Sequence, residues 1–251
     1  MTEPTWPAGY GQRVLASVDS TLDEAARIAP TLSGPQWILA LHQTAARGRR
    51  GRAWAMSAGN FAATLVLPIT EAPAQAALRS FVAALALREA LLAVTGRDDA
   101  FALKWPNDVL LRGGKVAGIL LESVGSGKSV SHLAIGIGVN LAAAPAPETL
   151  EPDALRPVSV RESLGQVVEP EAFLTPLAAA YARLEDQFRT YGFDPIRRAW
   201  LSHAARLGEP IRARTATATH DGTFLDMDAQ GQLVLETPKG RVSIPAADVY
   251  F

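Results

Sequence analysis

The residues best suited to chemistry lie together in one arginine-rich loop. The stretch Arg47-Gly48-Arg49-Arg50-Gly51-Arg52 is preceded by Gln43 and followed by Trp54. Each guanidinium is planar and permanently charged, so it suits phosphate and carboxylate oxygens, and the glycines let the backbone approach a ligand closely. The loop therefore suits an anionic ligand. A solvated loop, or a patch for nucleic acid or membrane, would use the same residues.

A second polar stretch interrupts an expected strand. Phe101 to Lys104 reads as a strand, and the proline of Trp105-Pro106 cannot donate to a sheet ladder, so the strand should end or bulge there. Asn107 and Asp108 follow the break. A lysine and a carboxylate on either side of it would suit phosphate and a divalent cation, but Pro-Asn-Asp is equally an ordinary turn.

Hydroxyl residues and glycines mark further candidate positions. Ser20 and Thr21 begin an expected helix, and Thr21 with Glu24 is spaced as a capping box. The hydroxyl pair therefore either caps the helix or, beside its free N–H groups, holds the polar head of a ligand. Gly118 and Gly136 lie inside apolar strands, where glycine is unfavourable unless a backbone or a ligand approaches closely.

Hydrophobic periodicity predicts the elements that position these residues. The expected strands are 13–18, 37–41, 61–67, 101–104, 109–111, 115–122 and 130–141, and the expected helices are 21–29, 75–94, 170–191 and 194–205. Residues 125–129 predict a hairpin turn, because Glu122 replaces the first glycine of a nucleotide-binding loop. Residues 142–157 predict a loop or spacer.

The last part of the chain changes character. Short expected strands at 211–215, 222–227, 233–237 and 242–244 are separated by Gly, Asp and Pro turns, which is typical of a small β-barrel or sandwich. We therefore expect two domains, residues 1–205 and residues 206–251.

Composition excludes several classes of function. The chain has no cysteine, which removes disulfides, thiolate metal sites and cysteine nucleophiles. The formal net charge of −1 argues against general nucleic-acid binding. The four histidines show no metal-ligand spacing, so we expect no zinc. The start does not read as a secretory signal and no apolar run suggests a membrane span, so we expect a cytoplasmic protein.

Taken in order, these motifs resemble the catalytic core of biotin protein ligases. The resemblance rests on Arg-Gly-Arg-Arg-Gly-Arg-x-Trp, Lys-Trp-Pro-Asn-Asp, Gly-Lys-Val-Ala-Gly-Ile-Leu and Gly-Ile-Gly-Val-Asn, and it spans roughly Val18 to Asn140. It implies an α+β fold: a class II synthetase-like catalytic domain with a mixed, mostly antiparallel sheet flanked by helices, and a small C-terminal SH3-like β-barrel. It also implies a two-step reaction in which biotin and MgATP give biotinyl-5′-adenylate. The biotinyl group then passes to a lysine of the biotin carboxyl carrier domain of a carboxylase.

The resemblance assigns roles to individual residues. Lys115, Arg47 and Arg49 are the expected catalytic residues, and Asp108 is the expected ligand of Mg²⁺. The residues expected to bind biotin are Ser20, Thr21, Gln43, Arg47, Lys115, Gly118 and Gly136. Those expected to bind ATP or the adenylate are Arg47, Arg49, Arg50, Arg52, Trp54, Lys104, Asn107, Lys115 and Asn140.

The sequence departs from the family pattern at two positions. Ala46 replaces a glycine before the loop, and Leu22 replaces an asparagine after the hydroxyl pair. Two alternatives stay open: a lipoate-type ligase of the same fold, and a non-enzymatic RNA-binding module that uses the Arg/Gly loop. The few residues before the first expected strand suggest no DNA-binding domain and hence no operator binding. We expect no nucleic-acid or membrane partner, and a homodimer is compatible with the sequence.

Overall fold

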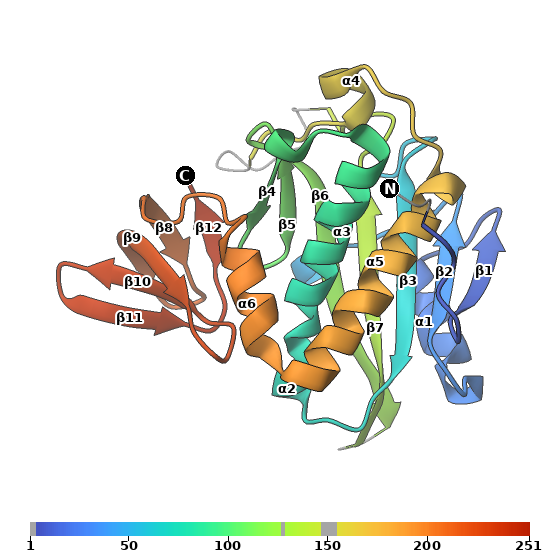
Figure 1. The fold of residues 1–251 in the computed structure, drawn as a ribbon, viewed down its shortest axis with the longest axis horizontal. Helices are drawn as coiled ribbons and strands as arrows, with labels where there is room; N and C mark the ends of the chain where they lie inside the picture. The colour runs from blue at the N-terminus through green and yellow to red at the C-terminus, as the bar shows by residue number, and fades with distance from the viewer. Residues whose placement is uncertain (1–3, 127–128, 147–154) are drawn as a thin grey trace.

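The main sheet has seven strands and carries the candidate site. The computed structural model describes residues 4–126, 129–146 and 155–251 (Figure 1). The strand order is β1-β2-β3-β7-β6-β5-β4; β1 and β2 are parallel and all other neighbours are antiparallel, as expected for a mixed, mostly antiparallel sheet. The strands are β1 (Gly11–Leu15), β2 (Gln36–Ala40), β3 (Phe61–Pro68), β4 (Phe101–Lys104), β5 (Asp108–Leu111), β6 (Gly114–Ser126) and β7 (Ser129–Val139).

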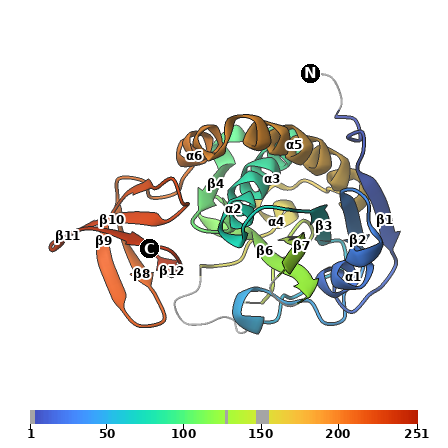
Figure 2. The same ribbon diagram turned by 90° about the horizontal axis from the view of Figure 1, so that it is seen from below.

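Helices cover the two faces of this sheet unequally. The helices are α1 (Thr21–Ile28), α2 (Pro73–Ala77), α3 (Arg79–Thr95), α4 (Val160–Leu164), α5 (Pro170–Tyr191) and α6 (Phe193–Leu201). Figure 2 shows α3, α5 and α6 as one layer, with α1 on the other side of the sheet. Strand periodicity explains this, because Trp37 and Leu39 join the core under α3 and α5 whereas Ile38 packs with α1.

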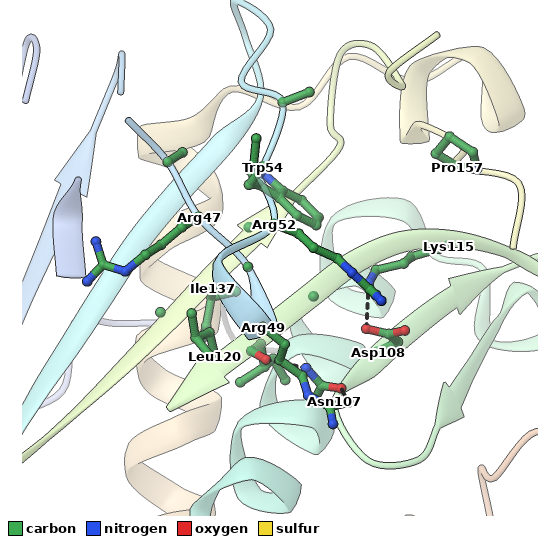
Figure 3. Close-up of a pocket in the computed structure, with 18 of the residues that line it drawn as sticks. Arg47, Arg49, Arg52, Trp54, Asn107, Asp108, Lys115, Leu120, Ile137 and Pro157 are labelled. Carbon is green, nitrogen blue, oxygen red and sulfur yellow. Dashed lines mark hydrogen bonds and ion pairs between the residues drawn. The ribbon is translucent and has the colours of Figure 1, made fainter. Parts of the chain in front are cut away.

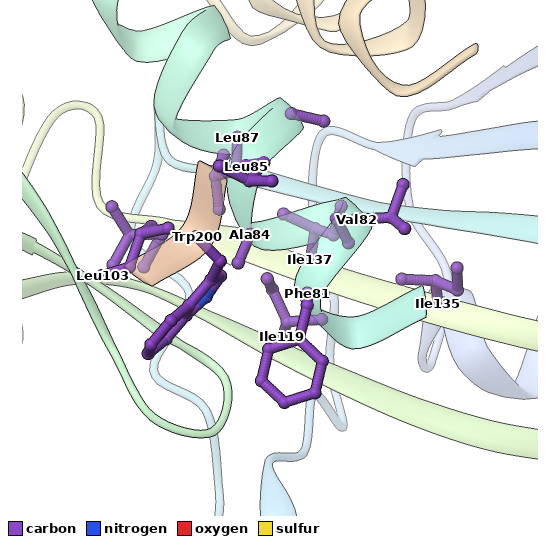
Figure 4. Packing of buried hydrophobic residues seen from close by; sticks show 14 of the residues in the cluster. Phe81, Val82, Ala84, Leu85, Leu87, Leu103, Ile119, Ile135, Ile137 and Trp200 are labelled. Carbon is purple, nitrogen blue, oxygen red and sulfur yellow. The ribbon is translucent and has the colours of Figure 1, made fainter. Parts of the chain in front are cut away.

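The larger core lies between the sheet and α3. Phe81, Val82 and Leu85 of α3 lie near Ile119 and Ile137 of the central strands (Figure 4). Phe81 also meets Trp200 of α6 edge to face, with ring centroids 5.7 Å apart. Each fully buried side chain of this kind contributes about 1.5–3 kcal/mol of burial free energy, so this face serves as the rigid support of the sheet.

A second, smaller sheet follows the helices. Its antiparallel strands are β8 (Pro210–Arg214), β9 (Thr219–Met227), β10 (Leu233–Thr237), β11 (Gly240–Ile244) and β12 (Asp248–Tyr250), in the order β11-β10-β9-β8-β12. A buried hydrogen bond from Trp105 Nε1 to the carbonyl oxygen of Gly231, 3.0 Å long, joins it to the main unit. Because the N–H of Ala205 still donates to Leu103 of β4 and the smaller sheet begins at Pro210, we propose the 205/206 division as the domain boundary.

The structure corrects several expected boundaries. The helix expected at 75–94 is two helices that break at Leu78, and the helix expected to reach residue 205 ends at Leu201. The first strand begins at Gly11, because its pairing with β2 decides its ends. Neither α4 nor β12 was expected, since both are short and weakly periodic. Part of the expected 125–129 turn and of the 142–157 loop lies outside the described residues.

No helix in the described ranges is both long and apolar enough to cross a membrane.

Candidate active site

A cavity of about 680 Å³ lies on the face of the main sheet opposite α3, and residues of the arginine loop and of the smaller sheet line it. Asp248, Val249 and Tyr250 of β12 form part of its wall, so both sheets contribute to it. Of the residues expected from the sequence, Arg50 alone does not line it. Those that do are Ser20, Thr21, Gln43, Arg47, Arg49, Arg52, Trp54, Lys104, Asn107, Asp108, Lys115, Gly118, Gly136 and Asn140.

Glycines of β6 and β7 make the floor of the cavity. Gly118 and Gly138 are cross-strand partners, and the Trp54 ring lies directly over them. A Cβ atom on Gly138 would stand 2.6 Å from Trp54 Cε2, which is closer than side chains allow, and one on Gly118 would stand 3.3 Å from Trp54 Cζ3. Gly138 therefore leaves the space in which the Trp54 indole packs. Gly138 was not among the expected site residues, although it stands two residues after Gly136 in the same motif and so faces the same side.

Two lysines and one aspartate form a charged cluster beside Trp54. Lys115 Nζ lies 2.8 Å from an Asp108 carboxylate oxygen (Figure 3). Lys104 Nζ lies 3.8 Å from the other oxygen of Asp108. Lys115 Nζ also lies 5.8 Å from the centre of the Trp54 ring. Burial lowers the pKa of Lys104 below its ordinary value, although the Asp108 carboxylate opposes the shift. The strand break at Pro106 places Lys104 and Asp108 opposite each other on β4 and β5.

Two asparagines complete the surroundings of this cluster. Asn107 donates from Nδ2 to the carbonyl oxygen of Ile119 at 2.5 Å and accepts from Arg49 at 3.3 Å. Asn140 is buried and donates from Nδ2 to the carbonyl oxygen of Val158 at 3.2 Å, while its Oδ1 has no partner among the described residues. Asn140 Oδ1 is therefore a buried acceptor without a hydrogen bond within the described ranges, in a residue that lines the cavity.

Arg47 does not point at the charged cluster. Its guanidinium donates to both oxygens of Glu122 at 3.1 and 2.9 Å and to Asp23 at 2.8 Å. These hydrogen bonds, to Glu122 first and Asp23 second, raise the pKa of Arg47 above its ordinary value. Figure 3 shows the side chain directed away from Lys115 and Asp108. Arg47 therefore ties the loop to β6 and α1 in this conformation.

Asp248 of β12 faces the other loop arginines. Its carboxylate lies 2.6 Å from Arg50, 3.8 Å from Arg52 and 3.9 Å from Arg49. Arg50 has a left-handed backbone with φ of 58°, which costs a side-chain-bearing residue about 1 kcal/mol and which this ion pair helps to hold. Arg50 is thus directed to the smaller sheet and not to the cavity.

The start of α1 lies at the other end of the cavity. Ser20 is the N-cap, since its Oγ accepts from the N–H of Leu22 at 3.2 Å. The expected capping box of Thr21 with Glu24 is therefore wrong by one residue, and Glu24 instead pairs with Arg13 and Arg27. Thr21 is free of capping and donates to Gln43 Oε1 from both its backbone N–H, at 2.7 Å, and its hydroxyl, at 3.1 Å.

The two positions that depart from the family pattern are accommodated. Leu22 packs over Gly136, where a Cβ atom would stand 3.1 Å from the leucine side chain, so this glycine makes room for Leu22. Ala46 does not need a left-handed backbone, and its carbonyl oxygen accepts from the N–H of Trp54 at 3.0 Å. Alanine therefore fits the observed loop without strain.

Within the described ranges there is no group of three or more His, Cys, Asp or Glu side chains placed to hold a metal ion. Asp108 is the carboxylate nearest the lysines and is mostly buried.

Two family models match the chain. The model described as "Biotin/lipoate A/B protein ligase family" matches residues 13–140, and the one described as "Biotin protein ligase C terminal domain" matches residues 207–251. The first range contains all the expected site residues, and the second contains the smaller sheet.

Known proteins are similar over nearly the whole chain. The biotin–[acetyl-CoA-carboxylase] ligase of Paracoccus denitrificans is 58% identical over 238 residues, which cover 95% of this chain and 99% of that protein. The bifunctional ligase/repressor BirA of Bacillus subtilis is 31% identical over 94% of this chain and 71% of its own length. A solved structure of the biotin protein ligase from Aquifex aeolicus, in complex with biotin and ATP, has a TM-score of 0.83 at 25% identity and covers 95% of this chain and 98% of that chain.

Proposed function

Because the chain belongs to the biotin/lipoate A/B protein ligase family and is a biotin protein ligase, we propose that the cavity described above performs both steps of the reaction. One observation carries this proposal. A single cavity joins an uncharged polar end, at Ser20, Thr21 and Gln43, to a cationic end, at Lys104 and Lys115, with Trp54 lying over its glycine floor.

The polar end suits the cyclic urea of biotin. Gln43 Oε1 is occupied by Thr21, so the Gln43 amide nitrogen is left to donate to a ligand carbonyl. The Ser20 hydroxyl accepts from Leu22 and keeps its own proton to donate. A urea offers a carbonyl acceptor and N–H donors, whereas the dithiolane ring of lipoate offers neither. This end therefore favours biotin over lipoate as the acid that is activated.

The cationic end suits the first chemical step. A carboxylate oxygen of biotin attacks the α-phosphorus of ATP, and the new O–P bond forms as the bond to pyrophosphate breaks. Because two anions must meet, the step depends on positioning and on stabilisation of phosphoryl charge. We assign the carboxylate and α-phosphate contact to Lys115, phosphate contacts to Lys104, Arg49 and Arg52, the adenine contact to Trp54, and nucleotide contacts to Asn107 and Asn140.

The loop arginines divide into two groups in this proposal. Arg49 extends toward Asn107 and lies at the edge of the cavity, so it meets phosphate oxygens directly. Arg47 and Arg50 are held by carboxylates in this conformation. We propose that they order the loop, and that contacts of either with the adenylate require these ion pairs to open.

The second step transfers the biotinyl group to a protein lysine. The acceptor amine attacks the carbonyl carbon of the mixed anhydride, the amide bond forms as AMP leaves, and the amine loses a proton. No protein nucleophile is needed, and we propose that the arginine loop, when it closes over the adenylate, keeps water from the anhydride. We propose as acceptor the biotin carboxyl carrier domain of an acetyl-CoA carboxylase or a related carboxylase, because the Paracoccus relative is a ligase for that enzyme.

Magnesium fits the site as an ion that arrives with the nucleotide. Mg²⁺ is commonly bound by one or two carboxylates together with substrate phosphates and water. Asp108 supplies one carboxylate beside the cavity, and the triphosphate would supply further oxygens. When bound, Mg²⁺ would neutralise phosphate charge. We therefore propose Asp108 as its protein ligand.

The test is ATP–pyrophosphate exchange with biotin, lipoate and octanoate offered separately, each with and without Mg²⁺. We expect exchange with biotin and Mg²⁺ only. Exchange with lipoate but not biotin would contradict the assignment of the polar end. Exchange that is independent of Mg²⁺ would contradict the role of Asp108.

A further inference from the structure

A chain of hydrogen bonds leads from the sheet to the polar end of the cavity. Thr64 of β3 is completely buried, and its hydroxyl donates to the hydroxyl of Thr21 at 2.8 Å. The Thr21 hydroxyl donates in turn to Gln43 Oε1 at 3.1 Å. Thr64 is the cross-strand partner of Gly136, yet it does not line the cavity. It reaches a ligand only through Thr21 and Gln43.

In this series of hydrogen bonds, the chemistry of each group decides which one donates and which one accepts. The Gln43 atom that lies 2.7 Å from the backbone N–H of Thr21 must be an oxygen, because that N–H can only donate. An amide oxygen can only accept, so the Thr21 hydroxyl must donate to it. The Thr21 hydroxyl has one proton, and therefore the proton between Thr64 and Thr21 comes from Thr64.

The result is a defined donor and acceptor pattern. Thr64 takes up one lone pair of the Thr21 oxygen, the proton of that oxygen is directed at Gln43, and one lone pair is left to accept from a ligand N–H. The Gln43 amide nitrogen, turned away from Thr21, is left to donate. Neither group can change its role without breaking a hydrogen bond that is buried or partly buried.

We propose that Thr64 is a positioning residue for recognition of the urea group, acting through the relay Thr64–Thr21–Gln43. This inference rests on the proposed function, since it concerns the end of the cavity assigned to biotin. Gln43 takes the proton of the Thr21 hydroxyl, and Thr64, by donating to one lone pair of the Thr21 oxygen, holds this hydroxyl in place with the other lone pair toward the ligand. In this way Thr64 helps the enzyme to select an acid that carries both a carbonyl and an N–H group. If Thr64 had only a packing role, valine, which has the same shape, would serve as well.

The test is the kinetics of ATP–pyrophosphate exchange by Thr64→Val and Thr64→Ser. Thr64→Val should raise the KM for biotin about fivefold, the effect of one neutral hydrogen bond, with the KM for ATP and the kcat at saturating biotin within about twofold of the wild type. Thr64→Ser keeps the hydroxyl and should restore the KM for biotin even where loss of the methyl lowers Tm.

Two further variants separate relay from packing. Thr95→Val removes another buried threonine hydroxyl, which donates to the carbonyl oxygen of Leu91 in α3, and should leave the KM for biotin unchanged. Thr21→Val should weaken biotin more than Thr64→Val does. The double variant should be no worse than Thr21→Val, because both changes break the same chain.

The outcomes distinguish this inference from the proposed function. An unchanged KM for biotin in Thr64→Val, or equal rises in the KM values for biotin and ATP that follow Tm, would overturn the relay while leaving the ligase activity in place. Absence of exchange with biotin in the wild type would overturn the proposed function and the relay with it. If Thr64→Val fails to fold, Thr64→Ala compared with Thr64→Ser gives the same comparison of hydroxyl absent and hydroxyl present.

Discussion

Lys115 is the side chain to which we assign contact with both the biotin carboxylate and the α-phosphate. It is ion-paired with Asp108 and lies beside the Trp54 ring, over the floor at Gly118. Without substrate its charge is balanced by Asp108. A carboxylate and a phosphate that enter the cavity would compete with that aspartate for the same ammonium group.

Replacing Lys115 by alanine should lower the kcat of biotin-dependent pyrophosphate exchange about 100-fold or more, which is typical of losing one charge-stabilising donor. The side chain is about one-third exposed, so Tm should change little. The control is Lys239→Ala, which removes an exposed lysine from the smaller sheet. Full activity in Lys115→Ala at an unchanged Tm would remove this residue from the mechanism.

Lys104 should make the KM for ATP rise at alkaline pH. Because burial lowers its pKa, Lys104 loses its proton at a lower pH than an exposed lysine, whose pKa is 10.5. It is charged below that lowered pKa and neutral above it, so the KM for ATP should rise as pH increases toward 10.5. Lys104→Arg stays charged throughout and should flatten the rise. KM values for ATP between about pH 7 and pH 10 decide the matter, and identical profiles for the two enzymes would contradict it.

At the scale of elements, β6 and β7 contribute to the site because several of their residues have no side chain. Their glycines at 118 and 138 leave space that Trp54 fills, and Gly136 leaves space that Leu22 fills. The opposite face of the same strands carries the isoleucines of the core (Figure 4). Alternate residues of these strands point to opposite faces, so the isoleucines join the core on one face and the glycines form the floor of the cavity on the other. One sheet therefore serves both stability and ligand binding.

Gly138→Ala should displace the Trp54 ring, since its Cβ would stand 2.6–2.8 Å from three indole atoms. We expect the KM for ATP to rise about tenfold, as for a lost stacking contact, and the KM for biotin to change much less. Gly34→Ala is the control, because its Cβ would meet only an ordinary contact at 3.7 Å. The tryptophan fluorescence, compared with that of Trp54→Phe because the chain has five tryptophans, would report the displacement. An unchanged KM for ATP would contradict the assignment of Trp54 to adenine.

At the scale of the whole molecule, the smaller sheet completes the site. Asp248 faces Arg49, Arg50 and Arg52, and the Phe251 ring lies 5.8 Å from Lys104 Nζ. The two units are thus joined where the catalytic charges lie. A substitution that disturbs the smaller sheet should therefore first change the conformation of the arginine loop.

Asp248→Asn should loosen that loop, because a neutral amide replaces the carboxylate that faces three guanidinium groups. Tryptic cleavage in the loop should become about fivefold faster without ligand, and ATP with biotin should restore protection. Asp221→Asn is the matched control, since Asp221 pairs with Arg212 within the smaller sheet. Equal cleavage rates for wild type and Asp248→Asn would show that the loop is ordered by other contacts.

The sequence by itself predicted the type of every strand except β12 and of the long helices, and it predicted many of the residues that line the cavity. Periodicity identified β3, β7 and α5, and the bias of residue types singled out the loop, Lys104, Asp108, Lys115 and two of the floor glycines. Such patterns are local, and the chemistry of a guanidinium or an ammonium is readable without coordinates.

Only the tertiary structure decided which partner each of these groups meets. The sequence did not indicate that Arg47 meets Glu122 and Asp23, that Asp248 meets the loop, that Gly138 seats Trp54, or that Thr64 reaches Gln43 through Thr21. These pairs join residues far apart in the chain, and strand order and register bring them together. Periodicity reports which face a residue occupies, but the neighbour across that face is set by how the strands pair and pack.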